Sequence, residues 1–240
     1  MKYLYKYHTH DDLLNYNQAL DNPNITLCSI DGEKTNDVHF DYKPYDKKIE
    51  YLKNNDKAYI DTKIKMHKWY GMGCTFAVTK HANSTWCIFC GSRTTFMYSL
   101  NWTVGSNGII SLVFDYLSGG SLQSGSTGLT YGDKMTFESR PDMTTMKMNA
   151  YYNGIYKAQT NLPTTDQAQT VNNWCFTSNN EWRTQESRIY EYWLTDQFGK
   201  RIIDLIPVRK GTTGYMYDKI TGKLFGNSGT GTFTLGPDIE

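Results

Sequence analysis

Long apolar runs and an excess of charge of one sign are both missing from this chain of 240 residues. No stretch approaches the roughly 18 consecutive apolar residues that a membrane-spanning helix needs, so membrane insertion is not expected. Met1 is followed directly by polar sequence, without the apolar segment of a secretory signal peptide. The formal net charge of +1 gives no electrostatic basis for binding nucleic acid or an anionic membrane. We therefore expect a protein that stays in the cytoplasm or leaves it by a route other than secretion.

Catalytic motifs are missing as well. The sequence contains no GxSxG, HExxH or P-loop pattern. Glycoside hydrolysis needs two carboxylates that flank one bond. Glu186 and Glu191 are separated by an odd spacing, so on one strand they face opposite sides, and Asp61, Asp115 and Glu138 are each isolated. We expect no catalytic residue and no enzyme activity. Distant carboxylates can converge, which keeps a glycoside hydrolase as the least favoured alternative.

Metal-binding motifs are sparse too. The five cysteines include one CxxC pair, Cys87 and Cys90, and a zinc ribbon would need a second pair. Residues three apart on a strand point to opposite faces, so we expect these two thiols to diverge and the cysteines to be free and mostly buried. His8 and His10 precede two aspartates and could hold a metal, but these residues equally suit a polar turn and a helix cap. No cofactor is expected, and calcium held by backbone carbonyls at a sandwich rim would leave no motif.

Strand-forming residues and turn signals make up most of the chain. Aromatic residues are 15% of the sequence, with 19 tyrosines, which suits strands better than helices. The stretch from Glu186 to Pro237 predicts five short strands, over 187–194, 201–208, 215–217, 223–225 and 232–235. Upstream, Asn153–Gly154 is the strongest hairpin signal. Turn residues recur about every 8–12 residues between some dozen predicted strands, which favours a mainly β sandwich over βαβ units.

Two segments lie outside this strand pattern. Residues 1–45 predict a strand over Met1–Tyr7, a helix from near Thr9 to about Leu20, and two more short strands. Such a small segment cannot build a good core alone, so it should dock on the sandwich, on another copy or on a larger scaffold. The glycine- and serine-rich run 118–128 predicts a mobile surface loop. The expected organisation is an attachment or oligomerisation segment over residues 1–45 and a sandwich over residues 46–240.

Three stretches resemble a known family. Residues 188–238, RIYEYWLTDQFGKRIIDLIPVRKGTTGYMYDKITGKLFGNSGTGTFTLGPD, resemble the last segment of concanavalin A-like, laminin G-like jelly-roll domains. Residues 49–65, IEYLKNNDKAYIDTKIK, resemble the opening pattern of the same family, with Lys63 where glycine is usual. Residues 89–93, FCGSR, resemble the end of one of its strands. Such domains occur in proteins of gut Bacteroidales and in virion proteins of their phages, including crAss-like phages.

The resemblance implies a concanavalin A-like jelly-roll sandwich, preceded by a small α/β attachment segment. It also implies a phage virion structural protein, such as a head fibre, a capsid auxiliary or a tail component. Residues 1–45 would then bind other virion proteins, and a homotrimer is favoured because displayed phage fibres are commonly trimeric. The displayed jelly roll could adhere to a glycan of the host surface. The alternative is a carbohydrate-binding module or adhesin of a gut bacterium.

Aromatic side chains are the candidates for glycan contact, because the CH face of a sugar packs on tryptophan or tyrosine. The expected glycan-binding residues are the rings of Trp102, Trp174 and Trp182 and the polar groups of Arg93, Tyr98 and Asn101. Each of the three tryptophans is next to an asparagine or lies in a polar segment, which predicts an exposed ring. Tryptophans also fill sandwich cores, so core packing stays open as the second interpretation of each ring.

Overall fold

The computed structural model of the chain describes residues 43–55, 57–81, 87–94, 96–105, 107–117, 120–177 and 185–239. The strands and the helix predicted over residues 1–42 lie outside this part of the chain, and so does Trp182. The division at residues 45 and 46 therefore stays a prediction. Every regular element in the described residues is a β-strand. Among them, no helix has the length and apolar character of a membrane span.

The larger of two antiparallel sheets contains eleven strands. They are β1 (Lys47–Lys48), β2 (Leu52–Asn55), β4 (Gly71–His81), β9 (Met135–Asp142), β10 (Lys147–Tyr152), β11 (Ile155–Asn161), β13 (Gln185–Thr195), β14 (Arg201–Lys210), β15 (Thr213–Asp218), β16 (Leu224–Phe225) and β17 (Thr232–Leu235). The main path is β11-β10-β9-β4-β13-β14-β15-β16, while β1 pairs with β14, β2 with β13, and β17 with β2. The five strands predicted between residues 187 and 235 are present as β13 to β17.

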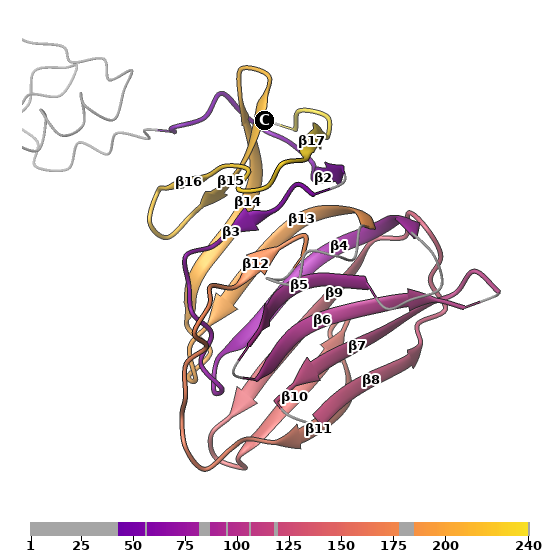
Figure 1. The fold of residues 1–240 in the computed structure, drawn as a ribbon, viewed down its shortest axis with the longest axis vertical. Coiled ribbons are helices and arrows are strands. Elements are labelled where there is room, and N and C mark those ends of the chain that lie inside the picture. The colour runs from indigo at the N-terminus through magenta and orange to yellow at the C-terminus, as the bar shows by residue number, and fades with distance from the viewer. Residues whose placement is uncertain are drawn as a thin grey trace, which may run out of the picture. The chain divides into compact units, whose positions relative to one another are not determined.

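The smaller sheet contains six strands. They are β3 (Ile60–Asp61), β5 (Cys87–Arg93), β6 (Met97–Val104), β7 (Ile110–Tyr116), β8 (Gly120–Ser126) and β12 (Trp174–Cys175). Their order is β3-β12-β5-β6-β7-β8. Figure 1 shows this sheet lying face to face over β4, β9 and β10 of the larger one, so the two form a sandwich. The predicted mainly β, jelly-roll fold is confirmed.

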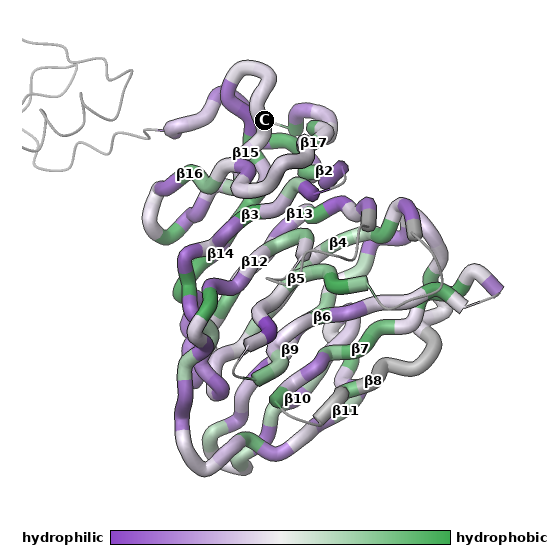
Figure 2. Tube along the Cα trace, viewed as in Figure 1, coloured by the Kyte–Doolittle hydropathy of each residue, from purple (hydrophilic) through white to green (hydrophobic). Residues whose placement is uncertain are grey.

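The core between the sheets follows from strand alternation. Hydrophilic and hydrophobic residues alternate along most strands in Figure 2, because successive side chains point to opposite faces. Phe76 of β4 packs against Phe89 of β5 with ring centroids 4.2 Å apart, and Phe114 of β7 lies 5.2 Å from Phe137 of β9. Each pair joins the two sheets, so aromatic contacts across the sandwich stabilise it, by roughly 0.5–1.5 kcal/mol each beyond their buried area.

The CxxC pair behaves differently from the prediction. Cys87 and Cys90 are both buried in the core cluster and do not diverge. The register of β5 against β6 shifts between Ile88 and Cys90, which is a β-bulge that inserts one extra residue. With the extra residue, a spacing of three brings both thiols to the same face. The expectation of buried thiols is confirmed for the four cysteines of the described residues, Cys74, Cys87, Cys90 and Cys175, and Cys74, Cys90 and Cys175 are free as expected.

The glycine- and serine-rich run 118–128 also differs from the prediction. Residues Gly120–Ser126 form β8, which pairs antiparallel with β7 at the edge of the smaller sheet. Leu122 is paired with Phe114 and is only 5% exposed. Backbone hydrogen bonds and one buried leucine are therefore enough to form a strand from a composition that is typical of a loop.

Candidate functional site

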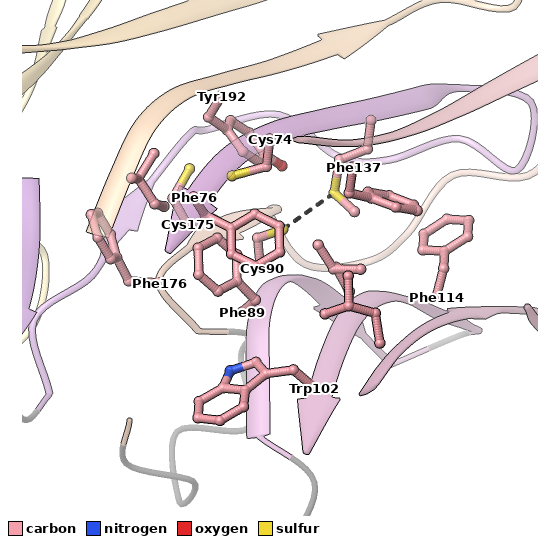
Figure 3. Packing of buried hydrophobic residues seen from close by; sticks show 14 of the residues in the cluster. Cys74, Phe76, Phe89, Cys90, Trp102, Phe114, Phe137, Cys175, Phe176 and Tyr192 are labelled. Carbon is pink, nitrogen blue, oxygen red and sulfur yellow. Dashed lines mark hydrogen bonds between the residues drawn. The ribbon is translucent and has the colours of Figure 1, made fainter. Parts of the chain in front are cut away.

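Tyr98 and Trp102 lie on the core face of β6. Both side chains are 0% exposed, and the Tyr98 hydroxyl donates a hydrogen bond to the Tyr70 carbonyl. Trp102 belongs to the buried cluster drawn in Figure 3. The expectation of an exposed Trp102 ring is therefore wrong. Its even spacing from Tyr98 and Leu100 places the ring on the apolar face of the strand.

Arg93 and Asn101 come together on the outer face of the smaller sheet, where Asp115 joins them. The Asp115 Oδ2 atom accepts a hydrogen bond from Asn101 Nδ2 at 2.8 Å and lies 3.6 Å from Arg93 Nη2. Asn101 is only 2% exposed, and its Oδ1 has no hydrogen-bond partner. Because these groups are largely buried and interact with one another, their evident effect is to hold β5, β6 and β7 together.

Trp174 lies one strand away, on β12, and is half-buried. It is paired with Gly91 of β5, and its ring stacks on Tyr59 with centroids 4.2 Å apart and an interplanar angle of 19°. One face of the ring is thus covered by an aromatic neighbour. The structure brings Arg93 and Asn101 together through Asp115 but turns Tyr98 and Trp102 into the core. The role of these residues as glycan contacts stays a prediction.

A cavity of about 430 Å³ lies on the larger sheet, in a place that sequence reasoning did not select. Its lining comes from β9 and the following turn, and from the end of β13 and the turn that leads to β14: Glu138, Arg140, Pro141, Asp142, Met143, Thr195, Gln197, Phe198 and Gly199. The strand between them, β4, begins at Gly71 opposite Thr195. Both neighbouring hairpins therefore extend past the start of β4 and enclose the cavity. Its volume is in the range of small-molecule sites.

The β9–β10 turn forms one wall of the cavity. Asp142 Oδ1 accepts hydrogen bonds from the backbone amides of Thr144 and Thr145 at 2.9 and 3.1 Å. Its Oδ2 accepts one from the Thr145 hydroxyl at 2.6 Å. These bonds, led by the Thr145 hydroxyl, hold the pKa of the Asp142 carboxyl below its usual value. Both carboxylate oxygens are therefore engaged in stabilising the turn.

The β13–β14 turn forms the opposite wall and carries the one large apolar ring of the lining. Asp196 Oδ1 accepts hydrogen bonds from the amides of Phe198 and Lys200 at 2.9 and 3.0 Å. Gly199 has φ = 81°, a left-handed conformation that favours glycine. Phe198 is 80% exposed although the hydrogen bonds to Asp196 hold the turn that carries it. The sequence signal for this exposure was an aromatic residue beside a glycine, between the strands predicted over 187–194 and 201–208.

The glycines at the start of β4 allow the neighbouring strands to approach closely beside the cavity. A Cβ atom on Gly71 would collide with Thr195 Oγ1 and with the Ser139 carbonyl, and one on Gly73 would collide with the Trp193 ring. Glycine inside a strand often marks such a close approach. The Gly71–Met72–Gly73 pattern in the sequence is therefore a mark of close packing between β4 and its neighbours.

An ion pair on β9 supplies charge to the cavity. Arg140 Nη2 donates a hydrogen bond to Glu138 Oε2 at 2.6 Å, and the guanidinium carbon lies 4.4 Å from the centre of the Tyr151 ring. This bond to Glu138 raises the pKa of Arg140. Among the described residues, including those of the cavity, no group of three or more His, Cys, Asp or Glu side chains is placed to hold a metal ion. The cavity therefore combines an exposed ring with polar groups that point to binding.

No protein-family model matches the chain. No curated protein matches it either. Similar solved structures include that of a candidate carbohydrate binding protein from Bacteroides ovatus, which is 12% identical with a TM-score of 0.53. The match covers 80% of this chain but only 62% of that chain.

Two further solved structures are similar at lower scores. The SAP-like pentraxin of Limulus polyphemus is 9% identical with a TM-score of 0.44, over 60% of this chain and 76% of that chain. The CBM40 of the Ruminococcus gnavus IT-sialidase is 9% identical with a TM-score of 0.27, over 81% of this chain and 92% of that chain. At 12% identity the likeness to the Bacteroides ovatus protein concerns the fold alone, and the described part of the chain is a jelly-roll β-sandwich.

Proposed function

We propose that the protein is a non-catalytic, lectin-like domain that binds a glycan in the cavity between the β9–β10 and β13–β14 turns. The observation that carries the proposal is the Phe198 ring, 80% exposed on a pinned turn above a cavity of about 430 Å³. A pyranose ring has one flat CH face and a rim of hydroxyls. Phe198 would pack on the CH face, while Gln197, Glu138 and Thr195 would bond the hydroxyls.

Binding fits the carboxylates of the cavity better than hydrolysis does. Asp142 accepts three hydrogen bonds and has a lowered pKa, so it is ionised at neutral pH and cannot serve as a general acid. Glu138 is paired with Arg140 at 2.6 Å, so one of its two carboxylate oxygens is engaged in an ion pair. A glycosidase needs one protonated carboxyl group. The name of the Bacteroides ovatus neighbour, a candidate carbohydrate binding protein, also supports binding.

The cavity is tested by replacing Phe198. We expect Phe198→Ala to weaken binding on a glycan array at least tenfold, which is about 1.4 kcal/mol. Because the ring is exposed, the free energy of unfolding should change by less than about 0.5 kcal/mol. Tyr131→Ala removes another exposed ring, 45% exposed and outside the cavity lining, and serves as the matched control. Retention of binding in Phe198→Ala together with its loss in Trp174→Ala would place the site on the smaller sheet.

The proposed setting of this domain is the surface of a phage particle. The resemblance of residues 188–238 to jelly rolls of phage virion proteins supports it. Residues 1–45 would bind other virion proteins, and the sandwich would be displayed outward as part of a head fibre, capsid auxiliary or tail component. Electron microscopy of virions that lack the protein should show an appendage or decoration missing. Virions unchanged in every appendage would count against this setting and favour a bacterial adhesin.

A further inference from the structure

We propose that the cavity selects uncharged glycans and rejects those that carry a carboxylate or a sulfate. This inference rests on the proposed glycan-binding function and assigns the ligand class of the same site. It follows from the net negative charge of the lining and from the ion pair between Glu138 and Arg140.

Negative charge is in excess in the lining. Glu138 and Asp142 are acidic, and Arg140 is the one cation among the residues that line the cavity. The remaining lining residues are neutral. An anionic sugar would therefore enter a site that already carries one more negative than positive charge, and like charges at this range repel.

The positive charge of Arg140 is already offset by its ion pair with Glu138. Its Nη2 atom is bonded to Glu138 Oε2 at 2.6 Å, and its guanidinium lies over the Tyr151 ring at 4.4 Å. A sugar carboxylate that reached this group would have to share it with Glu138, whose charge already offsets that of the guanidinium. On the neighbouring strand, Arg201 is paired with Glu191 at 2.9 Å and with Asp204 at 2.7 Å, so it does not compensate.

Neutral sugars meet no such penalty. Hydroxyl groups donate as well as accept hydrogen bonds, so they can bond a carboxylate, a paired guanidinium or an amide without adding charge. The Glu138 side chain is 24% exposed and keeps Oε1 outside its bond to Arg140. Glu138 thus acts as an acceptor for a sugar hydroxyl and as the group whose negative charge offsets that of Arg140.

Glu138→Gln tests this role, because glutamine keeps the shape of glutamate but loses the charge. The full chain and the variant are compared on an array of matched glycans, in which each neutral oligosaccharide stands beside its sialylated, sulfated and uronic counterparts. We expect the wild-type protein to bind the neutral members at least tenfold more tightly than their acidic counterparts. In Glu138→Gln, the ratio of acidic to neutral glycan binding should rise at least tenfold.

A matched control and a second variant separate charge selection from other effects. Glu186 is also an ion-paired glutamate, 2.6 Å from Lys53 and 27% exposed, but it is not part of the cavity, so Glu186→Gln should leave the ratio unchanged. Adding Arg140→Gln to Glu138→Gln should remove the gained binding of acidic glycans.

Three results would decide against the inference. Equal or tighter binding of acidic glycans by the wild type, sensitive to Phe198→Ala, would overturn the selection but leave the glycan-binding function standing. An unchanged ratio in Glu138→Gln would overturn the role of Glu138. Binding of no glycan by a folded protein would overturn the proposed function, and the inference with it.

Discussion

At the scale of single residues, the thiols of the core are shielded by burial. Figure 3 shows Cys74, Cys90 and Cys175 close together between the sheets, and all three are 0% exposed. Cys90 and Cys175 are directly opposite each other in the register of β5 and β12. Burial raises the pKa of the Cys74 and Cys175 thiols well above the usual value, because the charged thiolate would lose its water. A thiol that stays protonated and buried is a poor nucleophile.

This burial predicts that the core cysteines resist alkylation. In native protein at about pH 8, iodoacetamide should leave Cys74, Cys90 and Cys175 unlabelled, and all three should react in guanidinium. Peptide mapping by mass spectrometry assigns each site, and Cys28→Ser removes the cysteine that lies outside the described residues. Native labelling at the rate of the unfolded chain would contradict the burial of these thiols.

The aromatic residues show the same dependence on position. Trp102 and Phe198 are both large and apolar, yet one is 0% and the other 80% exposed. Trp102 lies inside a strand at an even spacing from core residues, while Phe198 lies in a turn between two strands. Position within the element, rather than residue type, decided which ring is available to a ligand.

At the scale of elements, two pinned turns shape the candidate site. The Asp196 carboxylate accepts two amide hydrogen bonds within the β13–β14 turn and so holds the turn that carries Phe198. The Asp142 carboxylate does the same for the β9–β10 turn. Two walls that are ordered in the free protein lower the entropy lost on binding.

The Asp196 turn predicts a coupled loss of stability and binding. Asp196→Ala leaves two amides without their acceptor, so the free energy of unfolding should fall by about 1 kcal/mol in urea titrations. Glycan binding should also weaken several-fold, since the Phe198 ring is no longer held.

Two variants control this result. Asp196→Asn keeps an acceptor oxygen and should behave close to wild type. Asp133 accepts a backbone amide at 2.8 Å and a hydroxyl at 3.1 Å from Thr130, outside the cavity lining. Asp133→Ala should therefore lower stability without affecting binding. Equal binding by Asp196→Ala and wild type would show that the pinned turn does not support the site.

The β-bulges explain why alternation along a strand did not predict which of its side chains face the core. The register of β13 against β4 shifts between Ile189 and Glu191, so Ile189 and Tyr192, an odd spacing apart, are both buried in the core. This shift explains the imperfect alternation of residues 187–194 in the sequence. The bulge in β5 brought Cys87 and Cys90 to one face for the same reason. A bulge depends on pairing with a neighbouring strand, which alternation along one strand does not reveal.

At the scale of the whole molecule, the order of the strands brings distant segments together. The cavity combines residues 138–143 with residues 195–199, because β9 and β13 are the two neighbours of β4 in the larger sheet. Each half of the site was visible locally as a predicted strand or turn. Their adjacency depends on long-range pairing across more than half of the sandwich.

The sequence by itself determined the fold class and most strands, because alternation and turn residues act locally along the chain. It also showed which functions have no motif, charge excess or apolar run to support them, since these are properties of the sequence itself. Only the tertiary structure decided which aromatic rings are exposed, which face each thiol takes and where the cavity lies. Those outcomes depend on bulges, on strand order and on the pairing of residues far apart in the chain, and these are set by packing between the sheets.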